Sequence, residues 1–193
     1  FEGIDRLWDD EYEVYGLRLQ GDKLDSRLDS ATFSLVDAFV AYDELESLSE
    51  RTLDRIESHV ETALADLYRE TDAVAGLVRF EDDWWRVAEQ DDPKIWSLST
   101  AWGANAAATL AVLLDDYGRP KEADRFLEEA TELYDLLGPD GPFTTEGGYL
   151  TEQVFDDGDA DSAAPLGWSH AMRLHATALL AEYDALPAPK PAP

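Results

Sequence analysis

The stretch Ala104-Asn105-Ala106-Ala107-Ala108-Thr109-Leu110-Ala111-Val112-Leu113-Leu114 carries small or apolar side chains on nearly every side of a helix. Such a helix is typical of a protein interior, because no face of it offers many polar groups to water. We therefore expect a buried helix over residues 94–117. Gly118 and Pro120 follow it and predict a tight connection to a second helix.

The second helix, over residues 121–137, has a different pattern. Its apolar side chains recur every three or four residues and acidic side chains fill the other face, which predicts an amphipathic helix that Gly138 ends. Residues 50–69 repeat the amphipathic pattern, with Ser49 as the N-cap. Residues 30–43 and 166–183 repeat the apolar pattern. Pro93 and Pro165 stand where a first-turn proline would begin two of the apolar helices.

Buried and amphipathic helices therefore alternate along the chain. A ring of helical hairpins needs this order, with an enclosed inner layer and an outer layer that faces water. We predict an all-α fold of alternating inner and outer helical hairpins, part of an (α/α)6 toroid, over residues 1–186. Residues 1–21 are expected to add one more helix, and residues 187–193 form a Pro/Ala-rich extended tail. The chain begins with Phe1 and holds about half the helices of such a toroid, so we expect it to be part of a longer protein.

The composition is strongly acidic, with 15 basic and 43 acidic residues and a net charge of −28. This charge repels phosphate backbones and anionic membranes, so we expect neither nucleic acid nor a membrane as a partner. The longest apolar run, Ala106 to Leu114, is also too short to span a bilayer. Apolar residues make up 45% of the chain and include 6 Trp, which argues against disorder.

High acidic content with few lysines resembles the proteins of extreme halophiles. Molar salt shortens the Debye length to about 3 Å and screens surface repulsion, whereas dilute buffer leaves that repulsion to destabilise the compact state. We predict loss of the fold in dilute buffer; equal helix content by circular dichroism at low and molar salt would contradict this. The chain has no Cys, and its 3 His show no metal-ligand spacing, so we expect no metal and no cofactor.

Two long loops, about residues 70–93 and 139–165, carry residues that suit carbohydrate chemistry. The second holds Leu150-Thr151-Glu152-Gln153-Val154-Phe155 and leads into Trp168-Ser169-His170-Ala171. The first holds Arg79-Phe80-Glu81-Asp82-Asp83-Trp84-Trp85 and leads into Trp96-Ser97-Leu98-Ser99-Thr100. An ionised carboxylate can deprotonate a water, and a guanidinium can bind two neighbouring hydroxyls. Flat aromatic rings suit the C–H faces of a pyranose.

Both loops resemble glycoside hydrolase family 15, the glucoamylase family, and occur in the family's order. There a Glu-Gln pair precedes a Trp-Ser-(His/Tyr)-Ala helix start, and an Arg-aromatic loop precedes a Trp-x-x-(Cys/Ser)-Thr helix start. The resemblance implies an exo-acting α-glucosidase that works with inversion, with Glu152 as the general base. It implies substrate-binding roles for Arg79, Asp82, Asp83, Trp85, Trp96 and Trp168. The implied substrate is an α-glucan oligosaccharide or disaccharide, with starch-type glucans, dextran and trehalose left open.

The family's general acid lies upstream of this region in a Trp-Glu motif, for which this sequence has no match. An inverting glycosidase needs two carboxylates, roughly 6.5–9.5 Å apart, on either side of the scissile bond. The resemblance thus covers about residues 25–185, the C-terminal half of the family's catalytic domain. It implies the upstream half of the same barrel as a partner, and an isolated chain that is inactive or self-associating.

Other interpretations of these loops stay open. Trp84 and Trp85 also fit core packing, and Arg79 also fits a surface ion pair with Glu81 or Asp82. Residues 157–161 alternate Asp as a calcium loop does, but the Gly and Glu that such a loop requires are missing, so we expect an acidic surface loop.

Two other classes of protein also share features with this chain. Residues 118–137 resemble one helix of a tetratricopeptide, which would make the chain a helical-repeat interaction module, although no second copy follows at a spacing of about 34 residues. Another helical-toroid enzyme acting on sugars, an epimerase or lyase, is the third possibility. Such enzymes usually rely on His or Tyr groups, and the Glu-Gln loop favours hydrolysis.

Overall fold

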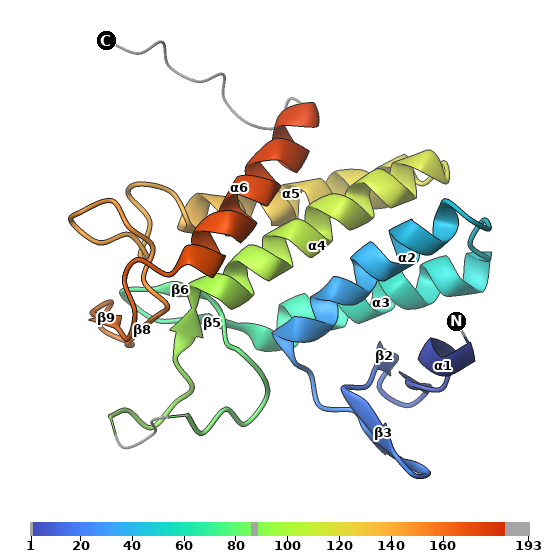
Figure 1. Ribbon diagram of the computed structural model, residues 1–193, viewed down its shortest axis with the longest axis horizontal. Helices are drawn as coiled ribbons and strands as arrows, with labels where there is room; N and C mark the ends of the chain where they lie inside the picture. Colours follow the sequence, from blue (N-terminus) through green and yellow to red (C-terminus); the bar gives the residue numbers. More distant parts are fainter. Residues whose placement is uncertain (1, 86–88, 184–193) are drawn as a thin grey trace.

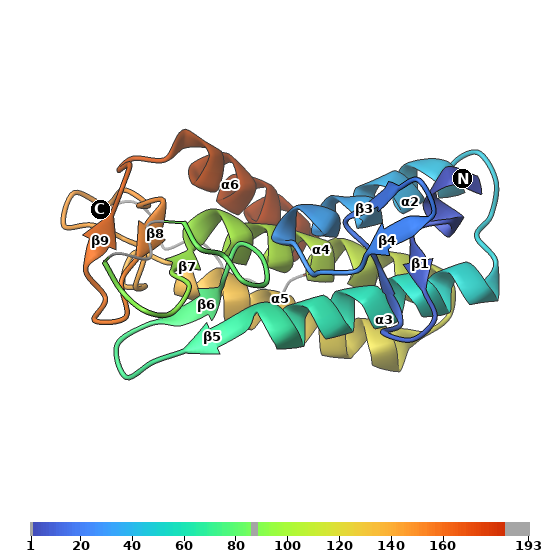
Figure 2. The same cartoon turned by 90° about the horizontal axis from the view of Figure 1, so that it is seen from below.

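The helices form two layers in the computed structural model, which describes residues 2–85 and 89–183. One layer holds α2 (Leu35–Asp43), α4 (Ser97–Asp116) and α6 (Gly167–Glu182), and the other holds α3 (Glu50–Leu67) and α5 (Pro120–Leu136) (Figures 1 and 2). A 3-10 turn, η1 (Ser30–Ser34), leads into α2, and a short helix, α1 (Glu2–Asp5), lies near the N-terminus. The central helix α4 contacts α2, α3, α5 and α6.

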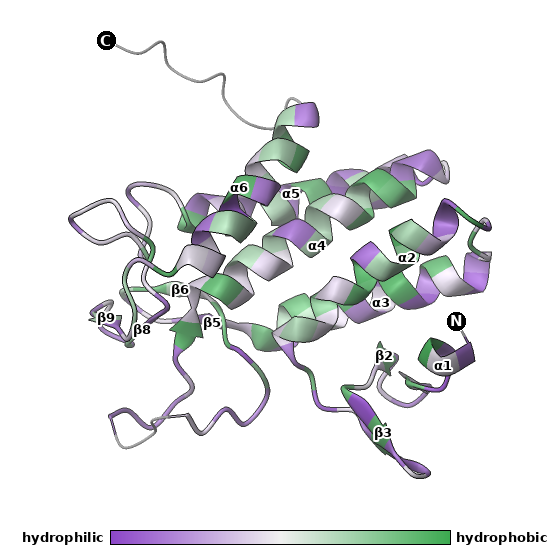
Figure 3. Cartoon of the chain, in the orientation of Figure 1, coloured by the Kyte–Doolittle hydropathy of each residue, from purple (hydrophilic) through white to green (hydrophobic). Residues whose placement is uncertain are grey.

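The composition of α4 explains its central place. Figure 3 colours most of its length green and white, and its Ala and Leu side chains are buried against both layers. Gly103 is needed there, because a Cβ on it would come within 2.5 Å of Leu77 Cδ1. By length and composition α4 could cross a membrane, but 78% of its most apolar window is buried in the fold, as in the core helix of a globular protein. The prediction of a buried helix here is confirmed.

The two amphipathic helices also lie where the sequence predicts them. The Ser49 side chain accepts a hydrogen bond from Thr52 N and begins α3, and Pro120 occupies the first turn of α5. Leu53, Ile56 and Val60 of α3 are fully buried, with the acidic side chains on the outside. The predicted helical periodicity of these two segments is therefore confirmed.

The prediction of an all-α toroid is wrong, because the described residues also form four small antiparallel sheets. In each two-stranded sheet consecutive strands pair, and the three-stranded sheet joins distant segments. The two-stranded sheets pair β1 (Trp8–Asp9) with β2 (Val14–Tyr15), β3 (Arg18–Gln20) with β4 (Lys23–Asp25), and β5 (Tyr68–Glu70) with β6 (Ala75–Leu77). The three-stranded sheet has the order β7 (Ile95–Trp96), β8 (Gln153–Val154), β9 (Ala160–Asp161).

The strands escape a sequence search because each is two or three residues long. An alternating pattern needs about four to eight residues to be recognised. The helix expected over residues 1–21 is wrong for the same reason, since this region forms α1 and two hairpins. Pro93 and Pro165 do not begin helices either: β7 lies between Pro93 and α4, and α6 begins at Gly167. Residues 187–193, the expected tail, lie outside the described part of the chain.

Burial differs among the three apolar helices. Whereas α4 is enclosed, α6 buries only its Ser169, Ala176 and Leu180 side chains and exposes Leu174 at 71%. Similarly, α2 buries only Val36 and Phe39, so the expectation that these two helices are buried on most sides is wrong. Four of the nine apolar residues of α6 are Ala, and among the larger ones Trp168 and Leu174 lie exposed at 58% and 71%.

Candidate functional site

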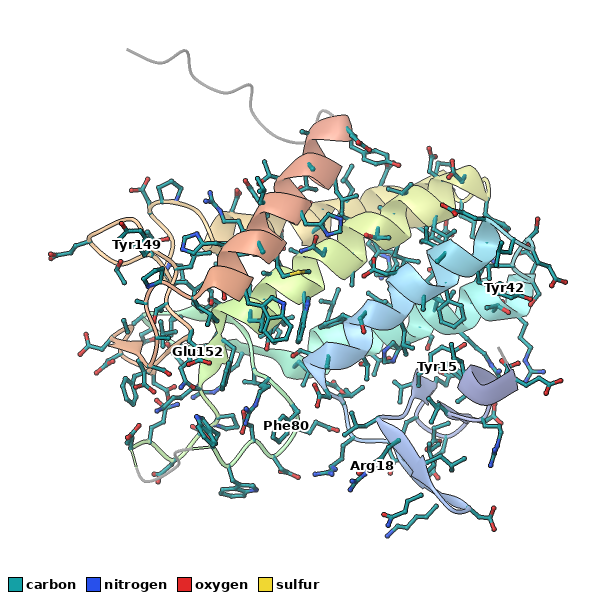
Figure 4. The ribbon with its side chains drawn as sticks, viewed as in Figure 1. Tyr15, Arg18, Tyr42, Phe80, Tyr149 and Glu152 are labelled. Atoms are coloured by element: carbon teal, nitrogen blue, oxygen red, sulfur yellow. The ribbon has the colours of Figure 1, made fainter. Side chains whose placement is uncertain are left out.

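The three-stranded sheet brings the two motif loops together at one end of the helical layers. β7 pairs with β8 so that Trp96 lies opposite Gln153 and Ile95 opposite Val154. Ser97 N, at the start of α4, donates a hydrogen bond of 3.0 Å to the backbone oxygen of Glu152. In Figure 4, Glu152 and Phe80 are labelled at this same end, which we call the loop end. The structure thus brings the two loops into direct contact.

Three segments meet at a pair of serines. Ser97 Oγ of α4 lies 2.7 Å from Ser169 Oγ of α6, and it also donates to the backbone oxygen of Thr151. This places the first turns of both helices against the loop that carries Glu152. Each serine follows a tryptophan at or near the start of its helix, in Trp96-Ser97 and Trp168-Ser169.

Arg79 is held rigidly within the first loop. Its Nε and Nη2 donate to the two carboxylate oxygens of Asp83 at 2.9 and 2.7 Å, and its guanidinium lies 4.6 Å from the Trp96 ring centroid. The Asp83 side chain is 2% exposed and also accepts a hydrogen bond from Trp85 N at 3.0 Å. The ion pair expected with Glu81 or Asp82 is therefore wrong, since the buried Asp83 is the partner.

Glu81 and Asp82 have other roles in this loop. Glu81 accepts a hydrogen bond from Leu28 N at 2.6 Å and ties the loop to the segment before η1. Asp82 is exposed and has a φ of 56°, a left-handed conformation that Asp adopts more readily than most residues. The structure accordingly gives Asp82 a turn position and leaves its carboxylate facing solvent.

Several aromatic side chains at the loop end face solvent. Trp84 is 69% exposed, Trp85 55% and Trp168 58%, so the interpretation of Trp84 and Trp85 as core residues is wrong. Trp96 is 7% exposed and supports Arg79 from behind. Trp168 contacts Trp102 of α4 edge to face, with ring centroids 5.4 Å apart, which fixes the orientation of the exposed ring.

Glu152 lies in a loop with several anchors. Its carboxylate accepts a hydrogen bond from Ser162 Oγ, and Ser162 itself has a left-handed φ of 66°. Arg69 of β5 binds both oxygens of Asp156 at 2.5 and 2.6 Å, which lowers the pKa of that carboxyl. Lys94 Nζ, buried, binds Asp161 at 2.7 Å. These cationic anchors were missed from the sequence, because each is separated from its partner by more than 60 residues.

The neighbours of Glu152 point away from it or support its loop. Gln153 is fully buried, and neither polar atom of its side chain has a hydrogen-bond partner among the described residues. His170 Nε2 accepts a hydrogen bond from Leu150 N at 3.0 Å, consistent with the supporting role expected of it. Of the acidic surface loop expected over residues 157–161, Asp157 and Asp159 lie in an exposed turn, whereas Ala160–Asp161 forms β9 and Asp161 pairs with Lys94. The described part of the chain contains no group of three or more metal-ligating side chains.

No family model, curated protein or solved structure matches this chain. The chemistry of the loop end therefore rests on its own groups. They are a partly exposed carboxylate with a hydroxyl donor, an oriented guanidinium, and three exposed indoles. This set suits a neutral, polyhydroxylated ligand better than an anionic one, because acidic groups outnumber cations across the chain.

Proposed function

We propose that the loop end is the base side of a glycosidase site, of the glucoamylase-like type that acts on α-glucans or α-linked disaccharides with inversion. The observation that carries the proposal is the link between the two motif loops. Arg79 stacks on Trp96, Trp96 pairs with Gln153, and Gln153 follows Glu152 directly. One short sheet thus couples a hydroxyl-binding group to a carboxylate that can activate water.

Arg79 has donors to spare for a sugar. A guanidinium has five N–H donors in a fixed plane. The ion pair to Asp83 takes one hydrogen from Nε and one from Nη2, so three remain, both on Nη1 and one on Nη2. These can bind two neighbouring hydroxyls, while the exposed faces of Trp85 and Trp168 offer stacking surfaces for the ring.

Glu152 is suited to the role of general base. In an inverting reaction the base takes a proton from water as the water oxygen attacks the anomeric carbon, and the bond to the leaving group breaks on the opposite face. One oxygen of Glu152 accepts from Ser162, which holds the carboxylate and leaves its second oxygen for a water. The partial exposure of Glu152 allows a water to reach it.

The Trp-Glu motif that carries the second carboxylate in the glucoamylase family has no match in this sequence. We therefore propose that this chain supplies the base and the sugar-binding surface, and that a group outside the residues assigned here protonates the leaving oxygen. The sequence also suggested a helical-repeat interaction module. That alternative does not explain why a buried aspartate orients Arg79 beside exposed tryptophans.

A substrate with an activated leaving group tests the base without the acid. α-D-Glucosyl fluoride loses fluoride without protonation by a general acid, so Glu152 alone would be needed. At molar salt we expect fluoride release above the background rate, with β-glucose as the first product by proton NMR. Glu152→Gln should lower the rate about 100-fold or more, the usual contribution of a general base.

The matched control is Glu146→Gln, an exposed carboxylate on a neighbouring loop, which should leave the rate unchanged. Circular dichroism establishes that all three proteins are folded. A folded wild-type chain that releases fluoride no faster than Glu152→Gln would overturn the assignment of the base. Release of α-glucose first would overturn inversion.

A further inference from the structure

The seam between α3 and α5 is bridged by two arginines. Arg119 binds Asp54 at 2.8 Å and Glu57 at 3.2 Å. Arg125, further along α5, binds Glu57 at 3.2 Å and Glu61 at 2.9 Å. Each guanidinium neutralises acidic side chains from the facing helix, so this half of the seam is closed by cations of the chain itself.

Beyond Arg125 the seam opens into a groove of about 630 Å3. Its floor is apolar and consists of Leu64, Leu77, Leu133 and Leu136. The volume lies within the range of about 300–1,000 Å3 that is typical of ligand sites. In Figures 1 and 2, α3 and α5 lie in the layer opposite α6. The lining of the groove contains none of the exposed tryptophans and no residue of the loop that carries Glu152.

The rim of the groove is acidic and its carboxylates are only partly neutralised, since Arg125 pairs with Glu61 and Glu132 has no ion pair among the described residues. Glu61, Glu129 and Glu132 line it. Glu129 Oε1 lies 3.8 Å from Arg125, whereas Glu129 Oε2 is buried and has no hydrogen-bond partner among the described residues. Burial raises the pKa of Glu129; the charge of Arg125 opposes this effect, and the charges of Glu61 and Glu132 add to it. An unpaired buried carboxylate oxygen is costly, so a cation supplied from outside would be favourable here.

We propose that this groove binds a cationic amphipathic helix of a partner protein. The apolar stripe of the partner helix would pack on the leucine floor. An Arg or Lys beside that stripe would bind Glu129 and Glu132, further along the seam than Arg125. A groove between two helices suits a helix as its occupant. A second copy of this chain does not fit, because the face that it would present is acidic as well.

A designed peptide tests the proposal directly. The probe is a capped, fluorescein-labelled helical peptide with Leu at i, i+4 and i+7 and Arg at the flanking positions. Its binding to the whole chain is followed by fluorescence anisotropy at the lowest salt at which the chain stays folded. We expect saturable binding. The Glu129→Gln/Glu132→Gln variant should bind the peptide about tenfold or more weakly, because the loss of one hydrogen bond to a charged group is enough to lower an affinity about tenfold.

The control variant is Asp124→Asn/Glu128→Gln, which removes the same charge from α5 at positions that do not line the groove. Its affinity for the peptide should change by less than about twofold, since rim charges outside a contact contribute little. An equal loss in both variants would reduce the binding to general attraction by the net charge and overturn the proposal. So would the absence of binding by a folded chain, or sedimentation showing that a second copy occupies the groove. Fluoride release at Glu152 does not enter any of these outcomes.

Discussion

Two arginines stack on tryptophans at different ends of this molecule, and their surroundings differ. At the N-terminal hairpins, Arg55 of α3 lies 4.7 Å from the Trp8 ring. It reaches two exposed carboxylates, Asp5 at 3.5 Å and Asp10 at 3.7 Å. At the loop end, Arg79 lies 4.6 Å from the Trp96 ring and binds both oxygens of one buried carboxylate.

The difference lies in what each carboxylate can do. Asp5 and Asp10 are 61% and 87% exposed, so water screens them, and Arg55, itself 13% exposed, is held mainly by its packing against Trp8. The Arg55 stack therefore serves to hold β1 against α3. Asp83 is desolvated and bidentate, so it fixes the plane of Arg79 and the direction of its free donors. The same pair of residue types is structural at one end and preorganised for binding at the other.

The largest expected effect that tests this difference comes from the carboxylates. Asp83→Asn would leave Arg79 partly buried beside Trp96 without its counter-charge. We expect a loss of about 3–5 kcal/mol in the free energy of unfolding, the usual result of breaking a buried pair. Asp10→Asn should cost less than about 0.5 kcal/mol, because the pair is exposed. Urea unfolding at molar salt measures both, and equal losses would remove the distinction between the two stacks.

Acid should weaken the hairpin end. His59 of α3 is buried; its Nδ1 accepts from Tyr15 N at 3.2 Å, and its Nε2 lies 3.1 Å from Thr32 Oγ1. Burial lowers the pKa of His59 from 6.5 to about 4. Because the folded pKa is below the unfolded one, the neutral ring's contribution is complete above about pH 6.5. It is lost as the pH falls towards 4, for a total of roughly 3 kcal/mol.

The variant His59→Gln isolates this titration, because an amide can accept from Tyr15 and donate to Thr32 without ionising. The wild-type chain should lose stability between pH 6.5 and 4 relative to the variant, and amide exchange at Tyr15 should speed up in the same interval. Parallel stability curves for the two proteins would show that His59 does not couple this end to pH.

The helices were predictable from the sequence because their signals are local. Leu53, Ile56 and Val60 recur at the helical period, and Ser49 marks the start of α3. The sheets were not predictable, since a strand such as Ile95–Trp96 exists through its pairing with Gln153–Val154, far along the chain. The predicted burial failed at α6, where large apolar side chains such as Trp168 and Leu174 face solvent.

The candidate site was predictable in part. The sequence singles out Arg79 and Glu152 as residue types in promising loops, and the structure brings those loops together. The sequence alone could not reveal that Asp83, and not Asp82, binds Arg79. The two aspartates are adjacent, and the left-handed turn at Asp82 decides which side chain points inward. Nor could the sequence reveal Ser162 beside Glu152, a contact made by the left-handed turn at residue 162.

Replacing each arginine by lysine compares the two ends of the molecule through their effect on acarbose binding. Arg79→Lys keeps the charge but loses the planar, bidentate geometry, so it should weaken binding of acarbose by about tenfold or more at molar salt. Arg55→Lys makes the same change at the hairpin end and should leave the affinity within about twofold, since no sugar contact is proposed there. Calorimetry measures both. A similar loss in both variants would mean that the effect passes through stability and not through the loop end.

A small effect on stability is expected for the exposed indoles. Trp168 is 58% exposed and rests on Trp102 by an edge contact, so Trp168→Ala should cost about 1 kcal/mol or less, the value of such an aromatic pair. Trp8→Ala, at the hairpin end, removes a partly buried ring that contacts Tyr15 at 5.1 Å and Arg55, and should cost more. Acarbose affinity should show the opposite order, with the larger loss in Trp168→Ala. If Trp168→Ala instead destabilises the chain more and leaves the affinity unchanged, Trp168 is a packing residue, and the sugar-binding surface would have to be built from Trp84 and Trp85.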